Sequence, residues 1–349
     1  MTAPPGQLRP ATPNPDPVPP RTRPGRTRRI VRYVAAALFT ALGVVVVLPD
    51  LLGLDRRVPF AQLVAFRVWV LLAGAIVLAL LALALLSRRA RPAVAPFLAG
   101  GLAVLLVGGA MVLPRVVADP LPTTGAPLTV LTFNAYEGLG DVDRVVALIA
   151  EHRPDLISLT EAGQDYAGEI GPLLEPMGYR LEVSSGAARD VYGVTAAVSD
   201  RLGDVRFRIG EETSAFPYVE VTGGALGSLR FVAYHAAAPV PGQMADWRDD
   251  LALLPQWCAG PTPAIVAGDL NASLDHSLLR TGATGCADAA DQRGAGLVPT
   301  WSPGIGFRSF GPQIDHVLVT GGIAAETFSA HDVLDSDHRA VVTRLRVPS

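Results

Sequence analysis

The sequence contains no lysine and only two cysteines, so neither a disulfide-rich scaffold nor a structural zinc is expected. All 29 basic residues other than histidine are arginines, and every strong positive charge is therefore a guanidinium. Neither cysteine has a ligand partner at the spacing of a zinc site. The chain also has no internal repeat of fixed period, which argues against a repeat architecture.

Acidic residues are scarce in the first third of the chain and abundant in the rest. Residues 1–120 contain 14 of the 29 arginines but only 4 of the 32 acidic residues. The remainder has 15 arginines against 28 acidic residues, a net charge of −13. This asymmetry predicts two parts in different surroundings. The negative second part argues against tight, sequence-independent binding of polynucleotides, which needs many contacts between cations and phosphates.

Three long apolar stretches without central charges dominate the first part, at residues 33–52, 68–86 and 93–113. Each approaches the roughly 20 residues that cross a bilayer, so residues 30–115 are predicted to form three transmembrane helices. A buried core helix would explain one stretch but not three in succession. A cleaved signal peptide is disfavoured because no small-residue cleavage pattern follows the first stretch. Residues 1–29, rich in Pro and Arg, are predicted to be a disordered basic arm.

The distribution of arginine predicts the orientation of these helices. Seven arginines precede the first stretch, and Arg88, Arg89 and Arg91 crowd the loop after the second. The loop after the first stretch has only Arg56 and Arg57, near the acidic residues Asp50 and Asp55. The positive-inside tendency therefore puts the N-terminus in the cytoplasm and, after three crossings, everything beyond the third stretch outside the cell membrane. Residues 116–126, with several prolines and glycines, are predicted to be a linker.

Residues 127–349 have the pattern of a soluble domain with one substantial core. A helical pattern at residues 143–150 lies among short β-rich runs at 128–133, 155–159, 193–198, 218–221, 229–234, 265–267, 316–319 and 340–345. Few helices separate the later runs. The pattern therefore favours a sandwich of mixed or antiparallel sheets with helical flanks over a doubly wound parallel sheet.

The stretch 264–273, A-I-V-A-G-D-L-N-A-S, is central to the prediction of function. A short apolar run stops at Gly268 and is followed by Asp269 and Asn271. Alternate residues of an extended segment point the same way, so these two polar side chains are expected side by side. An Asx turn would explain this motif alone. Further polar residues end or border other expected strands, however: Asn134, Glu161, His235, Asp315, Asp337 and His338.

If these strand ends share one rim, their carboxylates could not remain unpaired without a cation. In order, the motifs are F-N, T-E-A, Y-H with a downstream Pro, G-D-L-N, I-D-H and S-D-H-R. Together they resemble the endonuclease/exonuclease/phosphatase superfamily over residues of about 127–347. The resemblance implies an α+β, DNase-I-like fold of two packed mixed β-sheets flanked by helices.

The resemblance also implies a metal site. Glu161 resembles the main carboxylate ligand of a Mg²⁺ ion, with Mn²⁺ as an alternative. Asn134 is expected beside it, where it would hold the metal or a phosphoryl oxygen. Asp337 is assigned to this metal and also to fixing the ring of one histidine. Several nuclease members of the family have an acidic residue at the position of Tyr136, so a nuclease with a second metal is less favoured.

Five further residues take catalytic roles by the same resemblance. Asp269 is expected to orient or deprotonate the attacking water, and Asn271 to steady the nucleophile. His235 and His338 are expected to flank the phosphate as hydrogen-bond donors. Asp315 is the expected partner of the other histidine or a ligand of a second metal.

These inferences predict a membrane-anchored, Mg²⁺-dependent phosphohydrolase, either a phosphodiesterase or a phosphatase, with an extracellular catalytic domain. Its expected partners are the lipid bilayer and a phosphoester, either a small molecule or a phospholipid head group; nucleic acid is less favoured, and no protein partner is implied. The alternatives are a cell-surface endonuclease or exonuclease of the same fold, and a catalytically inactive binding module.

The two cysteines, Cys258 and Cys286, flank the motif that contains Asp269 and Asn271. Disulfides persist in the oxidising compartment predicted for this domain, whereas two buried free thiols would be usual in a cytoplasmic enzyme. The sequence therefore predicts a Cys258–Cys286 disulfide.

Overall fold

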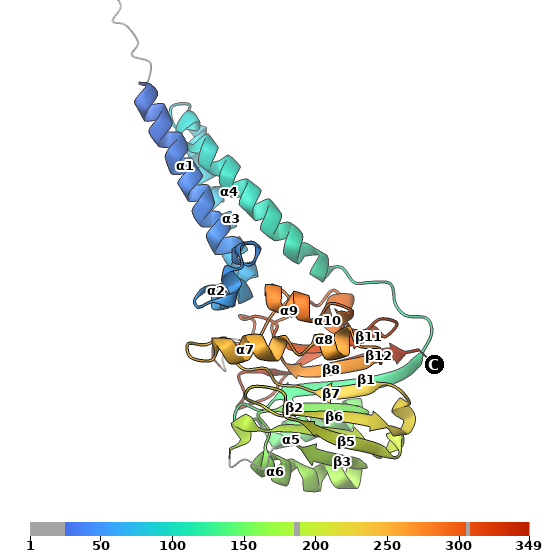
Figure 1. Cartoon of the computed structure of the whole chain (residues 1–349). Coiled ribbons are helices and arrows are strands. Elements are labelled where there is room, and N and C mark those ends of the chain that lie inside the picture. The colour runs from blue at the N-terminus through green and yellow to red at the C-terminus, as the bar shows by residue number, and fades with distance from the viewer. Residues whose placement is uncertain (1–24, 185–188, 305–307, 349) are drawn as a thin grey trace, which may run out of the picture.

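A slender bundle of apolar helices stands on one side of a β-sandwich (Figure 1). The structure is a computed structural model that describes residues 25–184, 189–304 and 308–348. The expected disordered arm lies outside the described residues up to residue 24. Residues 26–29 of that arm instead begin the first helix, so the helix starts earlier than residue 30.

The bundle contains α1 (Arg26–Val47), α3 (Arg67–Leu83) and α4 (Arg91–Val112). With the short helical turns that extend two of them, all three are long and apolar enough to cross a membrane. Their side chains are mostly exposed, as expected for helices whose outer surface faces lipid. Gly101 and Gly108 let α4 approach its neighbours, because an added Cβ would lie 2.6 Å from Leu78 and 2.7 Å from Leu71, respectively.

The loop between α1 and α3 folds back onto the sandwich. It contains η1 (Pro49–Leu52), η2 (Leu54–Arg56) and α2 (Phe60–Ala65), and it contacts α9 (Ser277–Gly282). Its two acidic residues, Asp50 and Asp55, are buried against this contact. The loop that carries them is therefore not open to solvent, although its position between two apolar stretches suggests a solvated loop.

The described part of residues 126–348 forms two mixed six-stranded sheets, which confirms the predicted fold class. The first sheet has the order β11-β12-β1-β2-β4-β3 and the second β5-β6-β7-β8-β10-β9. In each sheet one central pair is parallel, β1 with β2 and β7 with β8, and the other pairs are antiparallel. The strands are β1 (Ala126–Asn134), β2 (Leu156–Thr160), β3 (Tyr179–Val183), β4 (Val194–Ser199), β5 (Val205–Gly210), β6 (Tyr218–Gly223), β7 (Arg230–Ala233), β8 (Ala264–Asp269), β9 (Cys286–Asp288), β10 (Asp315–Thr320), β11 (Ala324–Asp332) and β12 (Arg339–Val347).

Apolar side chains from the facing sheets form the central core, and helices cover both outer faces. The core between the sheets is rich in Val, Ile, Leu and Ala. A second cluster packs α5 (Val142–His152) and α6 (Gln164–Leu174) on the first sheet. A third packs α7 (Met244–Leu251), α8 (Pro255–Cys258) and α9 on the second, while α10 (Ala289–Gln292) contacts β10 and β11.

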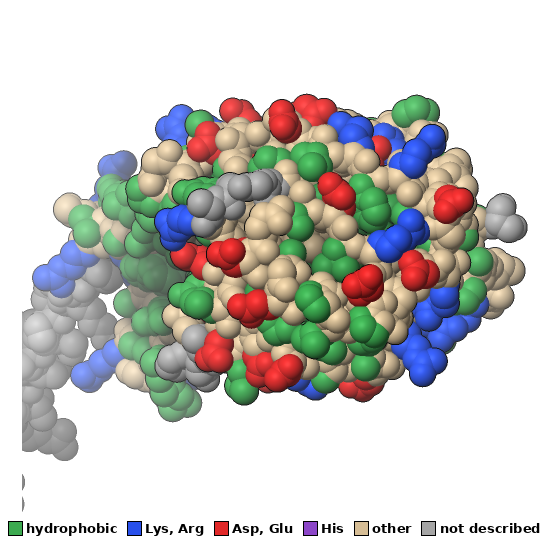
Figure 2. Space-filling model, turned by 90° about the horizontal axis from the view of Figure 1, so that it is seen from below, with side chains coloured by type: hydrophobic (Ala, Val, Ile, Leu, Met, Phe, Trp, Pro, Cys, Tyr) green, Lys and Arg blue, Asp and Glu red, His purple; other side chains and the backbone are tan. Residues whose placement is uncertain are grey.

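Four strands, β3, β5, β9 and β11, are absent from the sequence prediction. Each is an edge or near-edge strand with half-exposed residues, so it lacks the continuous apolar run that identifies a buried strand. The end of the sandwich away from the bundle carries interspersed acidic, basic and apolar side chains (Figure 2).

The predicted disulfide between Cys258 and Cys286 is present. It joins the end of α8 to the start of β9, and the two Cα atoms lie 5.0 Å apart. The bond closes the chain around Asp269 and Asn271, so it restricts the unfolded ensemble of the segment that carries them.

Replacing both cysteines by alanine should lower the free energy of unfolding by about 3–4 kcal/mol, the value expected for opening a loop of this length. Urea unfolding of the full-length chain in detergent, followed by tryptophan fluorescence, measures the difference. Alkylation of the unreduced, denatured wild type should label neither cysteine. Two reactive thiols, or equal stability of the two proteins, would contradict the prediction.

Candidate active site

The polar residues that end the strands meet at one rim of the sandwich. β1 ends at Asn134 and β2 is followed by Glu161, both on the first sheet. On the second sheet, β8 ends at Asp269, directly opposite Asp315 at the start of the antiparallel β10. His338 precedes β12 of the first sheet, so both sheets contribute to the same cluster.

Gly268 allows the two parallel strands β7 and β8 to meet closely just before Asp269. A Cβ at this position would lie 1.7 Å from the carbonyl oxygen of Tyr234, so a side chain cannot be accommodated. Beyond it, Asn271 adopts a left-handed conformation (φ 48°), which Asn tolerates better than most residues. Its backbone N–H donates to Asp269 Oδ1 (2.7 Å), which closes the turn that holds both side chains in the site.

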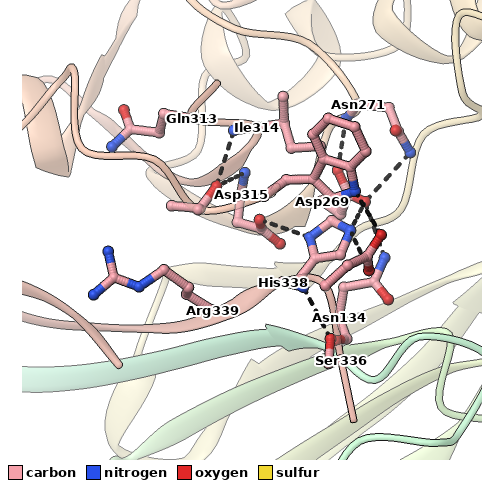
Figure 3. A network of polar contacts seen from close by, with 12 residues as sticks. Asn134, Asp269, Asn271, Gln313, Ile314, Asp315, Ser336, His338 and Arg339 are labelled. Atoms are coloured by element: carbon pink, nitrogen blue, oxygen red, sulfur yellow. Dashed lines mark hydrogen bonds and ion pairs between the residues drawn. The ribbon is translucent and has the colours of Figure 1, made fainter. Parts of the chain in front are cut away.

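Asp269 lies at the centre of the cluster (Figure 3). Its Oδ2 accepts hydrogen bonds from the side-chain amides of Asn134 (2.9 Å) and Asn271 (3.3 Å). The Nε2 atoms of His235 and His338 each lie 3.7 Å from the same oxygen. Burial raises the pKa of Asp269 to about 7, although the charge on His338 opposes the rise. This carboxylate is therefore able to take up a proton near neutral pH.

His338 is held by Asp315, whose Oδ2 lies 2.9 Å from Nδ1 of the ring. Burial alone would lower the pKa of His338, but the carboxylates of Asp315 and Asp269 outweigh it and raise the pKa to about 10. The ring is therefore protonated at neutral pH, with Nε2–H directed toward Asp269. Ser336 fixes the backbone here by accepting a hydrogen bond from the N–H of His338 (3.0 Å).

This pairing corrects one prediction. Asp337, expected to fix a histidine ring, instead accepts a hydrogen bond from the indole N–H of Trp301 (2.8 Å). Its other oxygen lies 3.9 Å from Nε2 of His338, too far for a hydrogen bond. The carboxylate that reaches Nδ1 of His338 is that of Asp315, which comes from the facing sheet.

His235 differs from His338 in its surroundings. Its ring stacks on Phe216, with centroids 4.1 Å apart, and its Nδ1 has no hydrogen-bond partner among the described residues. Burial, together with the charge on His338, lowers the pKa of His235 to about 3. The site therefore holds one protonated and one neutral imidazole, not two equivalent histidines.

Asn134 is placed as a donor, which differs from the metal-ligand role expected for it. Its side-chain oxygen accepts from the N–H of Tyr136 (2.8 Å), which turns the amide nitrogen toward Glu161 Oε1 (3.0 Å) and Asp269. Asn134 thus bridges two carboxylates across the sheets.

Glu161 and Asp337 offer the better fit for a divalent cation. One oxygen of Asp337 is buried with no hydrogen-bond partner in the described part of the chain. Burial raises the pKa of Glu161 and the nearby Asp337 adds to the rise, while hydrogen bonds from Asn134 and Glu137 oppose it. Glu161 also has a left-handed backbone (φ 52°), a strained conformation for a residue with a long side chain. A cation would satisfy the free oxygen and relieve the repulsion.

A second acidic group offers ligand atoms in a different place. Atoms of Asp269, Asp315 and His338 lie within 4.8 Å of one another, which is close enough for a metal. Here, however, Nδ1 of His338 is already engaged with Asp315 at 2.9 Å, and the protonated ring balances one of the two negative charges. We interpret this group as a hydrogen-bonded cluster.

The site opens into a cavity of about 450 Å³ that the sequence prediction did not delimit. It is lined by the catalytic candidates Glu161, His235, Asp269, Asn271, Asp337 and His338, but not by the two cysteines, which serve only the disulfide. Trp301, His276 and residues of α2 also line it. No recognisable motif surrounds these residues, so their role follows only from the three-dimensional arrangement.

The comparisons with known proteins agree with this geometry. Residues 131–338 match the model of the endonuclease/exonuclease/phosphatase family. The chain belongs to this family. A comparison with curated proteins found no match.

Solved structures show the same fold at low sequence identity. A humanised D. rerio TDP2 with 14 mutations is 15% identical, with a TM-score of 0.51 over 63% of this chain and 99% of that chain. A truncated Caenorhabditis elegans TDP2 is 17% identical, with a TM-score of 0.50 over 64% and 99%. A family protein from Bacteroides thetaiotaomicron is 14% identical, with a TM-score of 0.50 over 65% and 100%. At such identities the likeness establishes the fold alone.

His316, next to Asp315, points away from the cavity and supports the loop behind it. Its Nδ1 lies 2.7 Å from Asp288 and its Nε2 lies 2.8 Å from the carbonyl oxygen of Ala272. Burial would lower the pKa of His316, but Asp288 outweighs it and the pKa is raised. Both ring nitrogens therefore carry protons in the folded protein.

Replacing His316 by glutamine should lower the free energy of unfolding by about 3 kcal/mol at mildly acidic pH, because Asp288 loses its buried partner. A group whose pKa is higher in the folded state contributes its full stabilisation at pH values below its unfolded pKa, which is about 6.5 for histidine. This contribution is lost as the pH rises through the pKa of the folded state. The difference between wild type and variant should therefore shrink above pH 6.5. Urea unfolding across a pH series tests this, and a difference that stays constant or grows with pH would contradict it.

Proposed function

We propose that this chain is a membrane-anchored, Mg²⁺-dependent phosphoester hydrolase whose catalytic domain lies outside the membrane. The observation that carries the proposal is the convergence on Asp269 of two amides and two histidines from both sheets. In-line attack of water on a phosphoester needs a base for the water, donors for the phosphoryl oxygens and a means of balancing negative charge.

Asp269 is the base in this proposal. Its pKa of about 7 suits proton transfer near neutral pH. Asn271 supports the water, since its amide already spans Asp269 and the carbonyl oxygen of Ala236 (3.0 Å). Asn134 stands on the opposite side and keeps the carboxylate oriented.

The two histidines act as donors of different kinds. His338, protonated and oriented by Asp315, places a positive charge where negative charge develops on the phosphoryl group. His235, neutral and stacked on Phe216, offers a hydrogen bond without adding charge.

Glu161 and Asp337 would hold the cation. Mg²⁺ is the expected ion because both ligands are carboxylates, with Mn²⁺ as the alternative. When bound, the cation supplies charge stabilisation to a phosphoryl oxygen. Trp301 keeps one oxygen of Asp337 engaged and leaves the other available for the cation.

The substrate class we favour is a small phosphoester or a phospholipid head group. The 28 acidic residues against 15 arginines after residue 120 disfavour a polynucleotide. A cell-surface nuclease of the same fold is the alternative within the family. An inactive binding module fits less well, because every candidate catalytic residue lies at the one rim and six of them line the cavity.

Three features support the extracytoplasmic placement. Arginines flank the N-terminal end of α1 and the loop between α3 and α4. The opposite end of the bundle carries both the docked first loop and the catalytic domain, so one crossing direction accounts for both. The disulfide fits an oxidising compartment.

Replacing Glu161 by glutamine should lower turnover by at least about 10²-fold, because the change removes ligand charge while keeping the volume. Hydrolysis of a nonspecific phosphodiester, phospholipids and DNA by the full-length chain, each with Mg²⁺ and with EDTA, measures the effect. The exposed Glu175 offers a matched control, and Glu175→Gln should retain full activity. Undiminished activity of Glu161→Gln, or activity in excess EDTA, would refute the proposal, and preferential cleavage of DNA would favour the nuclease.

A tag at the C-terminus should be accessible from outside intact cells, and a tag at the N-terminus only after lysis. Protease digestion of whole cells and of lysates, followed by immunoblotting against each tag, reports both. The reverse pattern would place the catalytic domain in the cytoplasm.

A further inference from the structure

The cavity is not made by the catalytic domain alone. One wall comes from the loop between the first two membrane helices, and its residues there are Ala61, Gln62, Ala65 and Phe66. Opposite this wall stand the carboxylates and histidines described above. The membrane region therefore contributes directly to the space in which a substrate would bind.

Hydrogen bonds fix this wall to the catalytic domain. The Nε2–H of His276 donates to the carbonyl oxygen of Ala61 (2.9 Å), while its Nδ1 accepts from the N–H of Ser273 (2.9 Å). The carboxylate of Asp55 accepts from the N–H of Ser277 (2.6 Å). Gln62 donates to the carbonyl oxygen of Pro239, which lines the same cavity.

Buried charges hold the base of the wall. Arg67, at the start of α3, pairs with Asp50 of the loop and with Asp275 of the catalytic domain (2.8 Å). Arg115, just after α4, pairs with the same Asp275 (3.0 Å), and Arg280 pairs with Asp50 (2.6 Å). Arg67, Asp50 and Asp275 are buried and share partners in one network, so removing Arg67 would deprive both carboxylates of a buried partner.

The wall lies at the level where the bundle would leave the membrane. Phe66 directly precedes α3, and its ring packs on Phe310 of the catalytic domain with centroids 5.4 Å apart. Trp69, in the first turn of α3, packs on the same ring at 4.7 Å. Tryptophan is typical of the boundary between lipid and water. The cavity therefore lies beside the bilayer surface.

The lining has a polar part and an apolar part. The polar part, here called the floor, includes Glu161, Asp269, Asp337 and the histidines, whereas most other lining residues are Ala, Val, Ile, Pro or aromatic. Three lining residues are partly exposed: Tyr136 at 38%, Tyr192 at 46% and Val240 at 40% of the residue's surface. A ligand that matched this division would carry a phosphate at one end and hydrocarbon at the other.

We propose that α2 and Phe66 form a specificity wall for an amphiphilic phosphoester, which contacts the hydrocarbon part of the molecule while the phosphate meets the acidic floor. Hydrolysis of such a molecule rests on the proposed function, whereas its binding in the cavity does not. Phe66 is the residue that determines the preference, because it is the largest apolar side chain of the wall among those that line the cavity.

Binding of methyl phosphate and octyl phosphate to the full-length chain in phosphatidylcholine nanodiscs tests the proposal, with empty nanodiscs to subtract partitioning. Both ligands have the same charged group and differ only in hydrocarbon. Octyl phosphate should bind at least about tenfold more tightly, since burying two methylenes suffices for that ratio. Phe66→Ala should reduce the ratio to below about threefold, and Phe66→Leu should keep most of it.

Leu173, an exposed apolar residue of α6, provides a control for nonspecific hydrophobic contact, and Leu173→Ala should keep the wild-type ratio. Alkylation of the cysteines and thermal unfolding verify that each variant is folded. The proposal would be refuted if the wild type bound both phosphates equally or bound neither. It would also be refuted if Phe66→Ala and Leu173→Ala lowered the affinity ratio by the same amount.

A parallel assay separates this inference from the proposed function. Hydrolysis of methyl and octyl 4-nitrophenyl phosphate, which share a leaving group, should show the same chain-length preference as binding. A binding preference without hydrolysis of any phosphoester would refute the enzyme but keep the wall. Hydrolysis with equal specificity for both diesters, unaltered in Phe66→Ala, would keep the enzyme and refute the wall.

Discussion

Burial of several carboxylates where the two sheets meet is the constraint on which the rest of the molecule depends. Asp269 and Asp315 face one another across β8 and β10, and each is almost completely buried. Like charges in such a place cannot persist without compensation. The protonated ring of His338, supplied by the other sheet, provides it. The cluster thus ties the sheets together at the rim and creates a neighbouring demand for a cation at Glu161 and Asp337.

The fold and most of the candidate site were predictable because several central strands are short apolar runs bordered by a polar residue, as at Asn134, Glu161 and Asp269. Gly268 marks the end of one run, and the polar residues after it share a face by the alternation of extended chain. Edge strands such as β5 and β11 escaped prediction, since their exposed residues interrupt the apolar pattern. The disulfide was predictable because the chain has only two cysteines and both lie in the domain that was predicted to face an oxidising compartment.

Partners across the sheets were not predictable. The sequence assigned Asp337 to the ring of one histidine and Asp315 to the other or to a second metal. In the folded chain, Asp315 meets the ring of His338, whereas Asp337 accepts from Trp301. Likewise, Arg67 directly precedes the apolar stretch 68–86 in the sequence. Only the folded chain shows that it is completely buried between Asp50 and Asp275. Such contacts join residues far apart in sequence, and no local pattern records them.

Asp275 forms ion pairs with two arginines, Arg67 at the start of α3 and Arg115 just after α4. This shared contact also limits how the domain can move. If only a flexible linker of the predicted length joined the domain to the helices, the ends of that linker would lie about 20 Å apart on average. The domain would then sample all orientations. Here two helical segments hold the domain at this one carboxylate, so the domain cannot rotate freely about the linker that joins it to α4.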